Sequence, residues 1–434
     1  MIRKKLLTLL AAAICLGVTA APALAFDWQK HKGTTLTFIT SNHPWSNAVL
    51  KYKDEFEKLT GMTLKVDTFQ EQQARQRMLT ILQSKGSDMD IFMSLKSRDG
   101  MMYNKAGWYA DLYPLVESAT SPDYNIDDFG KGPLEGEVFD GILTGIPLNI
   151  EGPVLYYRKD VFKELGLTPP TTLAELEAAC KVIKEKKPDM VPFVSRGLKP
   201  ALAFTFSVFI HNMGGEYFVD GKPAISSPIG KEAVDLYARL LRDYGPPGVV
   251  NYTFYQISAL YREGKAAMAF EASNEFNSMM EGGARLDDTG IMLLPAGPTG
   301  VQKPTVIGWG VSISNFSKNK EAAWYFIQWA TSAEMQERLI KDGLCPPRLS
   351  ALSSKTFEEW QAEAPIRKDW AAMVVELSKI GTGNVFGPGV INQPEGRDIL
   401  GQAVNEVMLG TKSVDDATAN ADKLLEAMVA KERR

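Results

Sequence analysis

The segment from Ile146 to Leu176 constrains the fold more than any other part of this 434-residue chain. It begins extended, because Pro147 and Pro153 lack a backbone N–H and disfavour helical geometry in the residue before each of them. The run VLYYR at 154–158 then favours a largely buried strand, since it is rich in β-branched and aromatic residues and too short for a stable helix. The apolar residues take helical spacing directly afterwards, so the segment predicts a strand followed by a helix.

The same segment also predicts where its first helix ends and where the next helix begins. Gly166 can adopt the left-handed conformation that ends a helix, and Pro169 and Pro170 prevent continuation. Thr172 stands three residues before Glu175. This is the spacing of a capping box at the start of a second helix.

This order resembles one family, the bacterial extracellular solute-binding proteins of family 1, which are maltose-binding-protein-like sugar receptors of ATP-driven importers. The matching positions are Pro147, Glu151, Leu155, Tyr157, Lys159, Asp160, Phe162, Gly166, Pro169, Pro170, Thr172, Glu175 and Leu176. Arg158 stands where the family usually has Asn. In that family a strand of this kind carries the chain from one lobe to the other. The alternative is an ordinary strand, turn and helix of some other α/β protein.

Three other segments extend the resemblance over nearly all of the chain after residue 25. The run AGWYADL at 106–112 is similar to the family's segment that covers the end of a sheet, and GKAAMAF at 264–270 is similar to its G-K-A-A-M strand. The run 409–417 resembles its closing pattern. We see no internal repeat and no low-complexity segment.

The first 25 residues predict a secretory signal peptide. Residues 3–5 are basic, residues 6–18 form an apolar run, and Ala-Leu-Ala at 23–25 is a small-residue cleavage site. We therefore expect cleavage after Ala25, a mature chain that begins at Phe26, and a periplasmic location.

There are two alternatives to a cleaved leader. A retained membrane anchor is disfavoured because the apolar run is short and no later stretch approaches eighteen unbroken apolar residues. Lipid attachment at Cys15 is disfavoured because Ile14 stands where a small residue would be expected.

Charge and length narrow the possible partners. The formal net charge of −4 becomes −7 when the three basic residues of the leader are removed, which argues against nucleic acid or an anionic membrane as a partner. The mature chain is longer than one hydrophobic core usually serves, so two lobes are expected. We assign 26–149 with 295–345 to lobe 1, and 150–294 with 346–434 to lobe 2. We expect a monomer.

Cys180 and Cys345 are the cysteines of the mature chain. A disulfide between them is permitted in an oxidising compartment, but two cysteines do not make a stapled framework. If the family lobes apply, the two residues lie in different lobes and a bond would obstruct hinge motion.

The rest of the chain predicts an alternation of strands and helices, which favours sheets with right-handed crossovers. Expected strands cover 34–40, 62–69, 90–94, 191–195, 264–270 and 307–314, with a hairpin at 136–145. One expected helix follows the first strand and ends near residue 59. Further helices are expected over 70–84, 173–183, 201–213, 227–243 and 320–341, and two more within 398–431, separated by a break at Gly410. The Pro- and Gly-containing segment 290–304 is the candidate for a second passage between lobes.

The motifs of most enzyme classes are absent from the sequence. The chain contains only His31, His43 and His211, and it lacks H-E-x-x-H, C-x-x-C, G-x-S-x-G and P-loop patterns. A glycosidase that uses a distant pair of carboxylates is not excluded this way. No cofactor and no metal site are predicted.

Mixtures of aromatic and polar residues occur where loops should follow strands, which is where open α/β sheets bind ligands. A cleft for polyhydroxylated ligands combines aromatic rings with charged and amide side chains. In lobe 1 and at the crossover, the resemblance implies ligand contacts by His43, with Trp45 beside it, and by Arg98, Asp99 and Glu151.

In the second part of the chain, the resemblance implies an aromatic contact by Phe204. Asn274 stands where the family often has Trp, and Arg397 lies near another aromatic position, so a smaller or more polar ligand is favoured. Trp309 is the candidate for a replacement ring, and Glu271 is a further candidate. Tyr252 and Tyr255 are weaker candidates.

Each of these residues also has a purely structural interpretation. Arg98 and Asp99 can form a surface salt bridge, and Glu151 can cap the hinge. Trp45, Phe204 and Trp309 can be core aromatics, and His43 can be a solvated loop residue.

The sequence as a whole predicts an α/β, two-lobed periplasmic-binding-protein fold, in which each lobe is a mostly parallel sheet flanked by helices. We expect the lobes to close on a sugar, sugar alcohol or short oligosaccharide by a hinge near 149–153 and 294–297, and membrane permease subunits of an importer to recognise the closed form. The alternatives are a receptor for a non-carbohydrate solute, such as an organic acid or metal complex, and a secreted carbohydrate-active enzyme.

Overall fold

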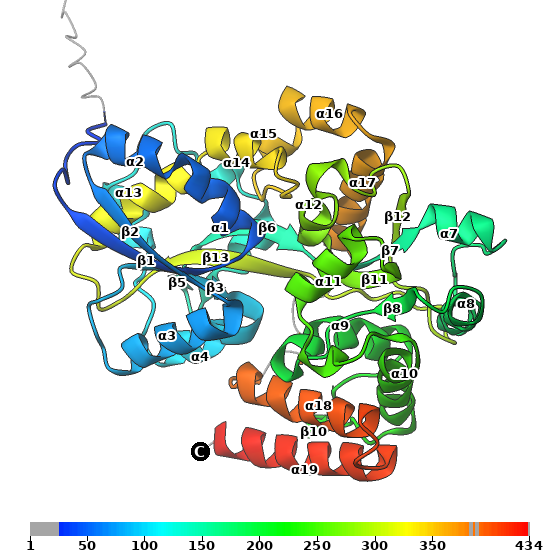
Figure 1. The fold of residues 1–434 in the computed structure, drawn as a ribbon. Coiled ribbons are helices and arrows are strands. Elements are labelled where there is room, and N and C mark those ends of the chain that lie inside the picture. The colour runs from blue at the N-terminus through cyan, green and yellow to red at the C-terminus, as the bar shows by residue number, and fades with distance from the viewer. Residues whose placement is uncertain (1–25, 382–384, 387–389, 433–434) are drawn as a thin grey trace, which may run out of the picture.

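The structure, a computed structural model, describes residues 26–381, 385–386 and 390–432. The predicted signal peptide, with Cys15, lies outside the described residues. A five-stranded sheet and a four-stranded sheet stand side by side, each with its own helices (Figure 1). We call the part built on the five-stranded sheet the first lobe and the part built on the four-stranded sheet the second lobe.

The first lobe contains a sheet of order β2-β1-β3-β13-β6. Its strands are β1 (Thr35–Ser41), β2 (Thr63–Phe69), β3 (Ile91–Leu95), β6 (Ile146–Glu151) and β13 (Ile307–Ile313). β1 pairs in parallel with β2 and β3, whereas β13 pairs antiparallel with β3 and β6. The strands expected from the sequence are confirmed, and the antiparallel pairs arise where β13 enters from the other lobe.

Alternation along β1 sends side chains to both faces of this sheet. Leu36 and Phe38 pack with Phe326, whereas Ile39 packs with Met78 on the other face. The helices of this lobe are α1 (Pro44–Val49), α2 (Lys53–Thr60), α3 (Glu71–Gln83), α4 (Met101–Lys105), α5 (Tyr113–Ser118), α6 (Lys131–Glu135), α13 (Lys320–Ala330) and α14 (Ala333–Ile340). The predicted hairpin is confirmed as β4 (Val138–Phe139) with β5 (Ile142–Leu143).

The second lobe contains a sheet of order β12-β7-β11-β8. Its strands are β7 (Pro153–Arg158), β8 (Val191–Val194), β11 (Ala266–Ala272) and β12 (Thr289–Met292). β11 pairs in parallel with β8 and antiparallel with β7, which also pairs antiparallel with β12. The α/β fold class is confirmed. The expectation of a mostly parallel sheet is wrong for this lobe, because two of its three strand pairs are antiparallel where β7 enters from the other lobe.

Helices cover both faces of the second sheet (Figure 1). Leu155 of β7 packs into one hydrophobic cluster, whereas Val154 and Tyr156 pack into another on the opposite face. The longer helices are α7 (Lys159–Glu164), α8 (Leu173–Lys186), α9 (Lys199–Asn212), α10 (Pro228–Tyr244), α11 (Phe254–Arg262), α16 (Lys355–Ala362), α17 (Pro365–Ile380), α18 (Gln393–Met408) and α19 (Val414–Glu432). Shorter elements are β9 (Phe218–Val219), β10 (Lys222–Pro223), α12 (Phe276–Met279) and α15 (Leu349–Leu352).

The chain passes between the sheets at Gly152, the residue that separates β6 from β7, and again between β12 and β13. A Cβ atom at Gly152 would lie 2.8 Å from the carbonyl oxygen of Thr305 and 3.0 Å from Leu377, so the two passages run close together there. The predicted capping box is confirmed, since Thr172 and Glu175 bond each other's backbone N–H.

The predicted single helix over 320–341 is wrong, because the structure has two helices in this range. α13 ends at Ala330, and Thr331 leaves helical geometry. The side chain of Ser332 then accepts a hydrogen bond from the backbone N–H of Met335 and begins α14. The break at Gly410 between α18 and α19 is confirmed, with Gly410 at φ 68°.

Cys180 and Cys345 are both buried and free. Their side chains belong to two different hydrophobic clusters of the second sheet. Cys180 packs with Leu155 and Cys345 with Val154, on opposite faces of the second sheet. The sheet itself therefore separates the two thiols. Among the described residues, none of the helices has the combination of length and apolar composition that a membrane span requires.

Candidate functional site

A cavity of about 400 Å³, including its opening to solvent, lies between the two lobes. The loop after β1, the start of α3 and the segment after β3 reach it from the first lobe, and the segments after β8 and β11, α9 and α18 reach it from the second. Its lining residues are His43, Glu71, Leu95, Arg98, Glu151, Arg196, Pro200, Ala201, Phe204, Phe254, Asn274, Glu275, Ile307, Trp309 and Arg397.

In the first lobe, the guanidinium of Arg98 is held in place by two carboxylates. Arg98 Nη1 donates to Glu71 Oε1 at 2.6 Å, and Arg98 Nη2 donates to Asp99 Oδ2 at 2.8 Å. Arg75 Nε donates to the other oxygen of Asp99 at 3.0 Å. Although burial acts in the opposite direction, Arg98 and Arg75 hold the pKa of Asp99 below its usual range. Arg98 therefore has a fixed position at the edge of the cavity.

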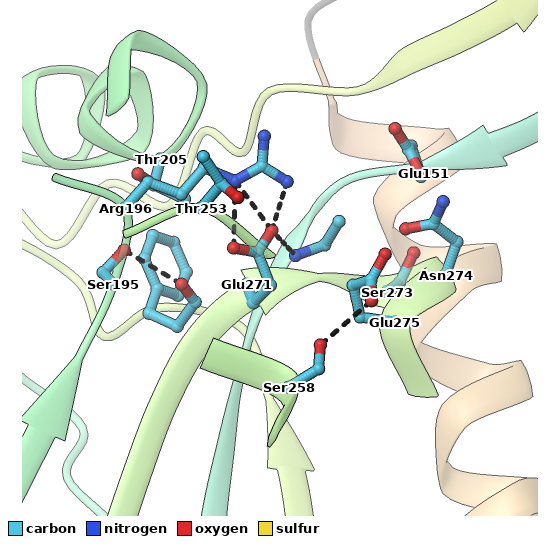
Figure 2. A network of polar contacts seen from close by, with 12 residues as sticks. Glu151, Ser195, Arg196, Thr205, Thr253, Ser258, Glu271, Ser273, Asn274 and Glu275 are labelled. Carbon is cyan, nitrogen blue, oxygen red and sulfur yellow. Dashed lines mark hydrogen bonds and ion pairs between the residues drawn. The ribbon is translucent and has the colours of Figure 1, made fainter. Parts of the chain in front are cut away.

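In the second lobe, Glu271 of β11 holds Arg196 in the same manner (Figure 2). Arg196 Nε lies 2.9 Å from both carboxylate oxygens of Glu271, and Nη2 makes a further bond to Oε1. The guanidinium lies over the Phe204 ring, 4.9 Å from its centroid, and over the Phe254 ring at 5.5 Å. The Arg196–Glu271 ion pair therefore places a charged guanidinium group against the aromatic rings of Phe204 and Phe254.

Glu151 at the end of β6 accepts hydrogen bonds on both oxygens. Trp309 Nε1 donates to Oε1 at 3.0 Å, and Asn149 Nδ2 donates to Oε2 at 3.3 Å. Burial raises the pKa of Glu151 to about 8. Because Arg98 lies over the Trp309 ring at 5.8 Å, the indole ring connects Glu151 with the arginine network of the first lobe.

His43 and Asn274 form a direct contact between the lobes. His43 Nδ1 accepts a hydrogen bond from the backbone N–H of Trp45 at 3.2 Å, and His43 Nε2 lies 3.1 Å from Asn274 Nδ2. Burial lowers the pKa of His43 to about 4, so the ring is neutral near pH 7. With Nδ1 as acceptor, Nε2 carries the proton and needs an acceptor, so the amide of Asn274 should face it with its oxygen.

Two buried groups of the second lobe have unusual proton affinities. Glu275, next to Asn274 in Figure 2, accepts a hydrogen bond from Ser258 Oγ at 2.9 Å, and burial together with Glu271 raises its pKa to about 7. Arg397 of α18 is 2% exposed, and its Nε and Nη2 have no hydrogen-bond partner among the described residues. Burial and the charge of Arg98 lower the pKa of Arg397 to about 9.

Seven of the ten residues proposed from the sequence lie around this one cavity. They are His43, Arg98, Glu151, Phe204, Asn274, Trp309 and Arg397. The structure places Asp99 and Glu271 behind the cavity, each bonded to an arginine that lines it. Trp45 is a fully buried core residue that packs with Phe38. Of the weaker candidates, Tyr255 lines an adjacent groove and Tyr252 is partly buried in the second lobe.

Sequence reasoning missed three charged residues of the cavity, Glu71, Arg196 and Glu275. The position of each residue in the sequence could have indicated that it belongs to the site. Glu71 is the first residue of the helix after the second strand, and Arg196 follows the strand VPFVS by one residue. Glu275 is adjacent to Asn274. A search for charged residues just after the carboxyl ends of predicted strands would have identified Glu71 and Arg196.

The cavity is suited to binding a small molecule rich in hydroxyl groups. Its arginines and amide groups supply donors, its carboxylates supply acceptors, and the rings of Trp309 and Phe204 supply apolar faces. Among the described residues, no group of three or more His, Cys, Asp or Glu side chains is arranged to hold a metal ion.

Comparison with known proteins supports a binding role. The family model described as bacterial extracellular solute-binding protein matches residues 40–337. The mannitol-binding protein of Pseudomonas aeruginosa is 26% identical over 93% of this chain and 95% of its own length. The erythritol/L-threitol-binding protein of Mycolicibacterium smegmatis is 25% identical over 82% of this chain and 79% of its own.

Solved structures that are similar to this chain are also solute-binding proteins. A solute-binding protein of an ABC transporter from Agrobacterium radiobacter K84, in complex with ribitol, is 28% identical with a TM-score of 0.81, and the match covers 92% of this chain and 98% of the other. A solute-binding protein from Agrobacterium vitis S4 with bound D-mannitol is 25% identical with the same TM-score, over 92% and 99% of the two chains.

Proposed function

The chain belongs to the bacterial extracellular solute-binding proteins, and from this membership we propose that it captures a linear sugar alcohol in the interlobe cavity and delivers it to the permease of an ATP-driven importer. The family and the relatives described above are non-enzymatic solute-binding proteins of ABC transporters. The chain therefore binds its ligand without converting it.

The observation that carries the proposal is the closed cavity itself, which both lobes line with charged, amide and aromatic groups. A linear sugar alcohol bears a hydroxyl on every carbon, and each hydroxyl can donate to a carboxylate and accept from a guanidinium. Glu71 is the acceptor carboxylate, Arg98 and Arg196 are the donors, and the Trp309 ring contacts the C–H face of the chain. Glu151, which holds its proton near pH 7, can donate to a ligand hydroxyl as well as accept from one.

The side chains that line the cavity favour a short ligand over a long oligosaccharide. Asn274 and Arg397 occupy positions where a ring would otherwise stack on additional sugar units. The neighbours that contain ribitol and D-mannitol support the same ligand class.

The lobe boundaries and the cellular location of the protein form part of the proposal. Family membership implies a periplasmic or extracellular location. We propose that the leader is cleaved after Ala25 and that the mature protein is a periplasmic monomer without a nucleic-acid partner. Its lobes comprise 26–149 with 295–345, and 150–294 with 346–434, and they close by the hinge at 149–153 and 294–297.

Isothermal titration calorimetry with erythritol, ribitol, D-mannitol and maltose tests the function. We expect one alditol to bind with 1:1 stoichiometry and maltose to bind at least tenfold more weakly. Glu151→Ala and Trp309→Ala should each raise the Kd at least tenfold, whereas Lys131→Ala, at a surface ion pair, should leave the Kd unchanged. An unchanged affinity in both cavity variants would place the ligand elsewhere.

One observation favours a second candidate, an organic acid derived from a sugar. The guanidinium of Arg397 is buried, and among the described residues no carboxylate lies within hydrogen-bonding distance of its Nε or Nη2. A carboxylate ligand would supply one. Titration with ribonate beside ribitol separates the two ligand classes. Tighter binding of ribonate that is lost in Arg397→Gln would favour the acid.

A further inference from the structure

A second cavity lies beside the strands that connect the lobes. It encloses about 760 Å³ of empty volume, including its opening. The segment after β3, α6, β6 and β13 contribute to its wall. Its lining residues include Lys96, Ser97, Gly132, Glu137, Asn149 and Gly308. It shares Ile307 with the interlobe cavity, and we call it the hinge cavity.

A buried ion pair forms one side of the hinge cavity. Lys96 Nζ lies 3.2 Å from Glu137 Oε2 and donates to Thr144 Oγ1 at 3.0 Å and to Ser312 Oγ at 2.8 Å. The ammonium therefore uses its three protons within the protein. Gly310 provides room for the carboxylate, because a Cβ atom there would lie 2.3 Å from Glu137 Oε2.

Two buried polar atoms at the hinge cavity have no hydrogen-bond partner within the described part of the chain. They are Asn149 Oδ1 and Ser97 Oγ. Asn149 is 0% exposed. A buried acceptor without a donor is unfavourable. An occupant that donates hydrogen bonds would therefore be stabilised here.

We propose that the hinge cavity is a second binding site, which takes a small neutral diol with one hydroxyl group that donates to Asn149 Oδ1 and another that bonds the Ser97 hydroxyl. The carbon chain of the diol contacts Pro147 and Ile150, which line the same cavity. A cation is disfavoured because Lys96 would repel it. An anion is disfavoured because it would face the side-chain oxygens of Asn149 and Glu137, with only the Ser97 hydroxyl free to donate.

Asn149 connects the hinge cavity to the interlobe cavity. Its Nδ2 donates to Glu151 Oε2 at 3.3 Å, and Glu151 lines the interlobe cavity. A diol on Asn149 Oδ1 fixes the amide that orients this carboxylate. The hinge cavity thus acts as an effector site for the interlobe cavity.

NMR of the protein with labelled isoleucine methyl groups and nitrogen-labelled tryptophan indoles tests this site with 1,4-butanediol as the probe. We expect the Ile150 methyl signal to shift with a millimolar Kd. 1,4-Dimethoxybutane, which has the same chain and no donor, should bind at least tenfold more weakly. Equal effects of the two compounds would overturn the proposal, as would a shift confined to the Trp309 indole signal, which reports the interlobe cavity.

A pair of variants on α6 provides the control. A Cβ atom at Gly132 meets nothing within 4 Å, so Gly132→Leu should fill the hinge cavity and abolish the Ile150 shift. Lys131→Leu adds the same side chain at an exposed position one residue earlier and should preserve the shift. Gly132→Val is the smaller substitute if the leucine variant does not fold. A shift that persists in a folded Gly132 variant contradicts the proposal, whether or not any sugar alcohol binds between the lobes.

Discussion

Arg98 and Arg196 are each fixed by a carboxylate that does not itself line the interlobe cavity. Asp99 bonds Arg98 and Arg75, while Glu271 bonds Arg196 and the backbone N–H of Ala272. These carboxylates hold the guanidinium groups in one orientation before a ligand arrives. The rotamer entropy that a long side chain loses on binding is therefore already lost.

Replacing Asp99 by asparagine should weaken ligand binding although Asp99 makes no contact with the cavity. The variant loses the charge that orients Arg98, so we expect the Kd for the preferred alditol to rise about tenfold, equivalent to ~1.4 kcal/mol. Calorimetry measures the Kd. Trp45→Phe is the control, because Trp45 is a core residue whose change should lower the melting temperature and leave the Kd within about twofold. A Kd that stays constant in a folded Asp99→Asn variant would remove Asp99 from the site.

The buried carboxyl group of Glu151 predicts a pH dependence of stability with a definite sign. Its pKa is raised in the folded protein to about 8, from an ordinary value of 4.5. Between these values the unfolded chain is ionised and the folded chain holds the proton. The stabilisation is therefore complete below pH 4.5 and decreases as the pH rises towards 8, by up to ~1.4 kcal/mol per pH unit.

Thermal unfolding of wild type and Glu151→Gln from pH 5 to pH 9 measures this effect. The glutamine variant keeps the shape of the side chain and cannot ionise, so the melting temperature of wild type relative to the variant should fall up to about pH 8 and then level off. A difference that is constant over the whole range would contradict protonation of Glu151 in the folded state.

Residue types at the site could be predicted from the sequence better than residue roles. Spacing relative to Tyr157 and Lys159 identified Glu151, and position after a strand identified Arg98. The sequence did not reveal that Asp99 and Glu271 lie behind the cavity or that Trp45 belongs to the core. Which side of a loop faces a cavity depends on packing between segments far apart in the chain, and a single sequence does not encode that directly.

At the level of elements, strands were predicted well because their short apolar runs are separated by Gly, Pro and polar residues. The exception among the helices is the range 320–341, where apolar residues continue at helical spacing through Thr331 and Ser332. Both residues are compatible with a helix interior, but Ser332 is also a strong N-cap. Packing of α13 and α14 in the first lobe favours the conformation in which Ser332 caps α14 over one continuous helix.

Ser332→Ala should therefore destabilise the protein by ~1 kcal/mol, because the backbone N–H of Met335 loses its acceptor at the start of α14. Chemical denaturation measures the free energy of unfolding. Ser353→Ala is a suitable control, because its hydroxyl bonds only carbonyl groups at the exposed end of α15. Equal stabilities of Ser332→Ala and wild type would indicate that the chain runs through 331–332 as one helix.

At the scale of the whole molecule, the two passages between the sheets decide how the protein works. The strands cross at Gly152 and again between β12 and β13, and the chain returns to the second lobe once more between α14 and α16, so each lobe is built from separate stretches of sequence. The proline-rich signals around both passages made this organisation predictable. The contacts that hold the lobes closed were not predictable, since His43 and Asn274 are separated by more than half of the chain.

The contact between His43 and Asn274 should contribute to ligand affinity through closure of the lobes. The two side chains meet directly, 3.1 Å apart, and both line the cavity. A hydrogen bond of this kind contributes ~0.5–1.5 kcal/mol, which corresponds to about two- to tenfold in affinity. His43→Ala and Asn274→Ala should each weaken binding by at least this factor, and the double variant should be weaker than wild type by less than the product of the two factors, because both substitutions remove the same bond.

Calorimetry on the four proteins gives this coupling energy, and small-angle X-ray scattering gives the state of the lobes. We expect ligand to reduce the radius of gyration of wild type at lower concentration than that of either single variant. Fully additive losses of affinity would mean that each residue binds the ligand independently. In that case the interlobe hydrogen bond is a consequence of closure and makes no contribution to it.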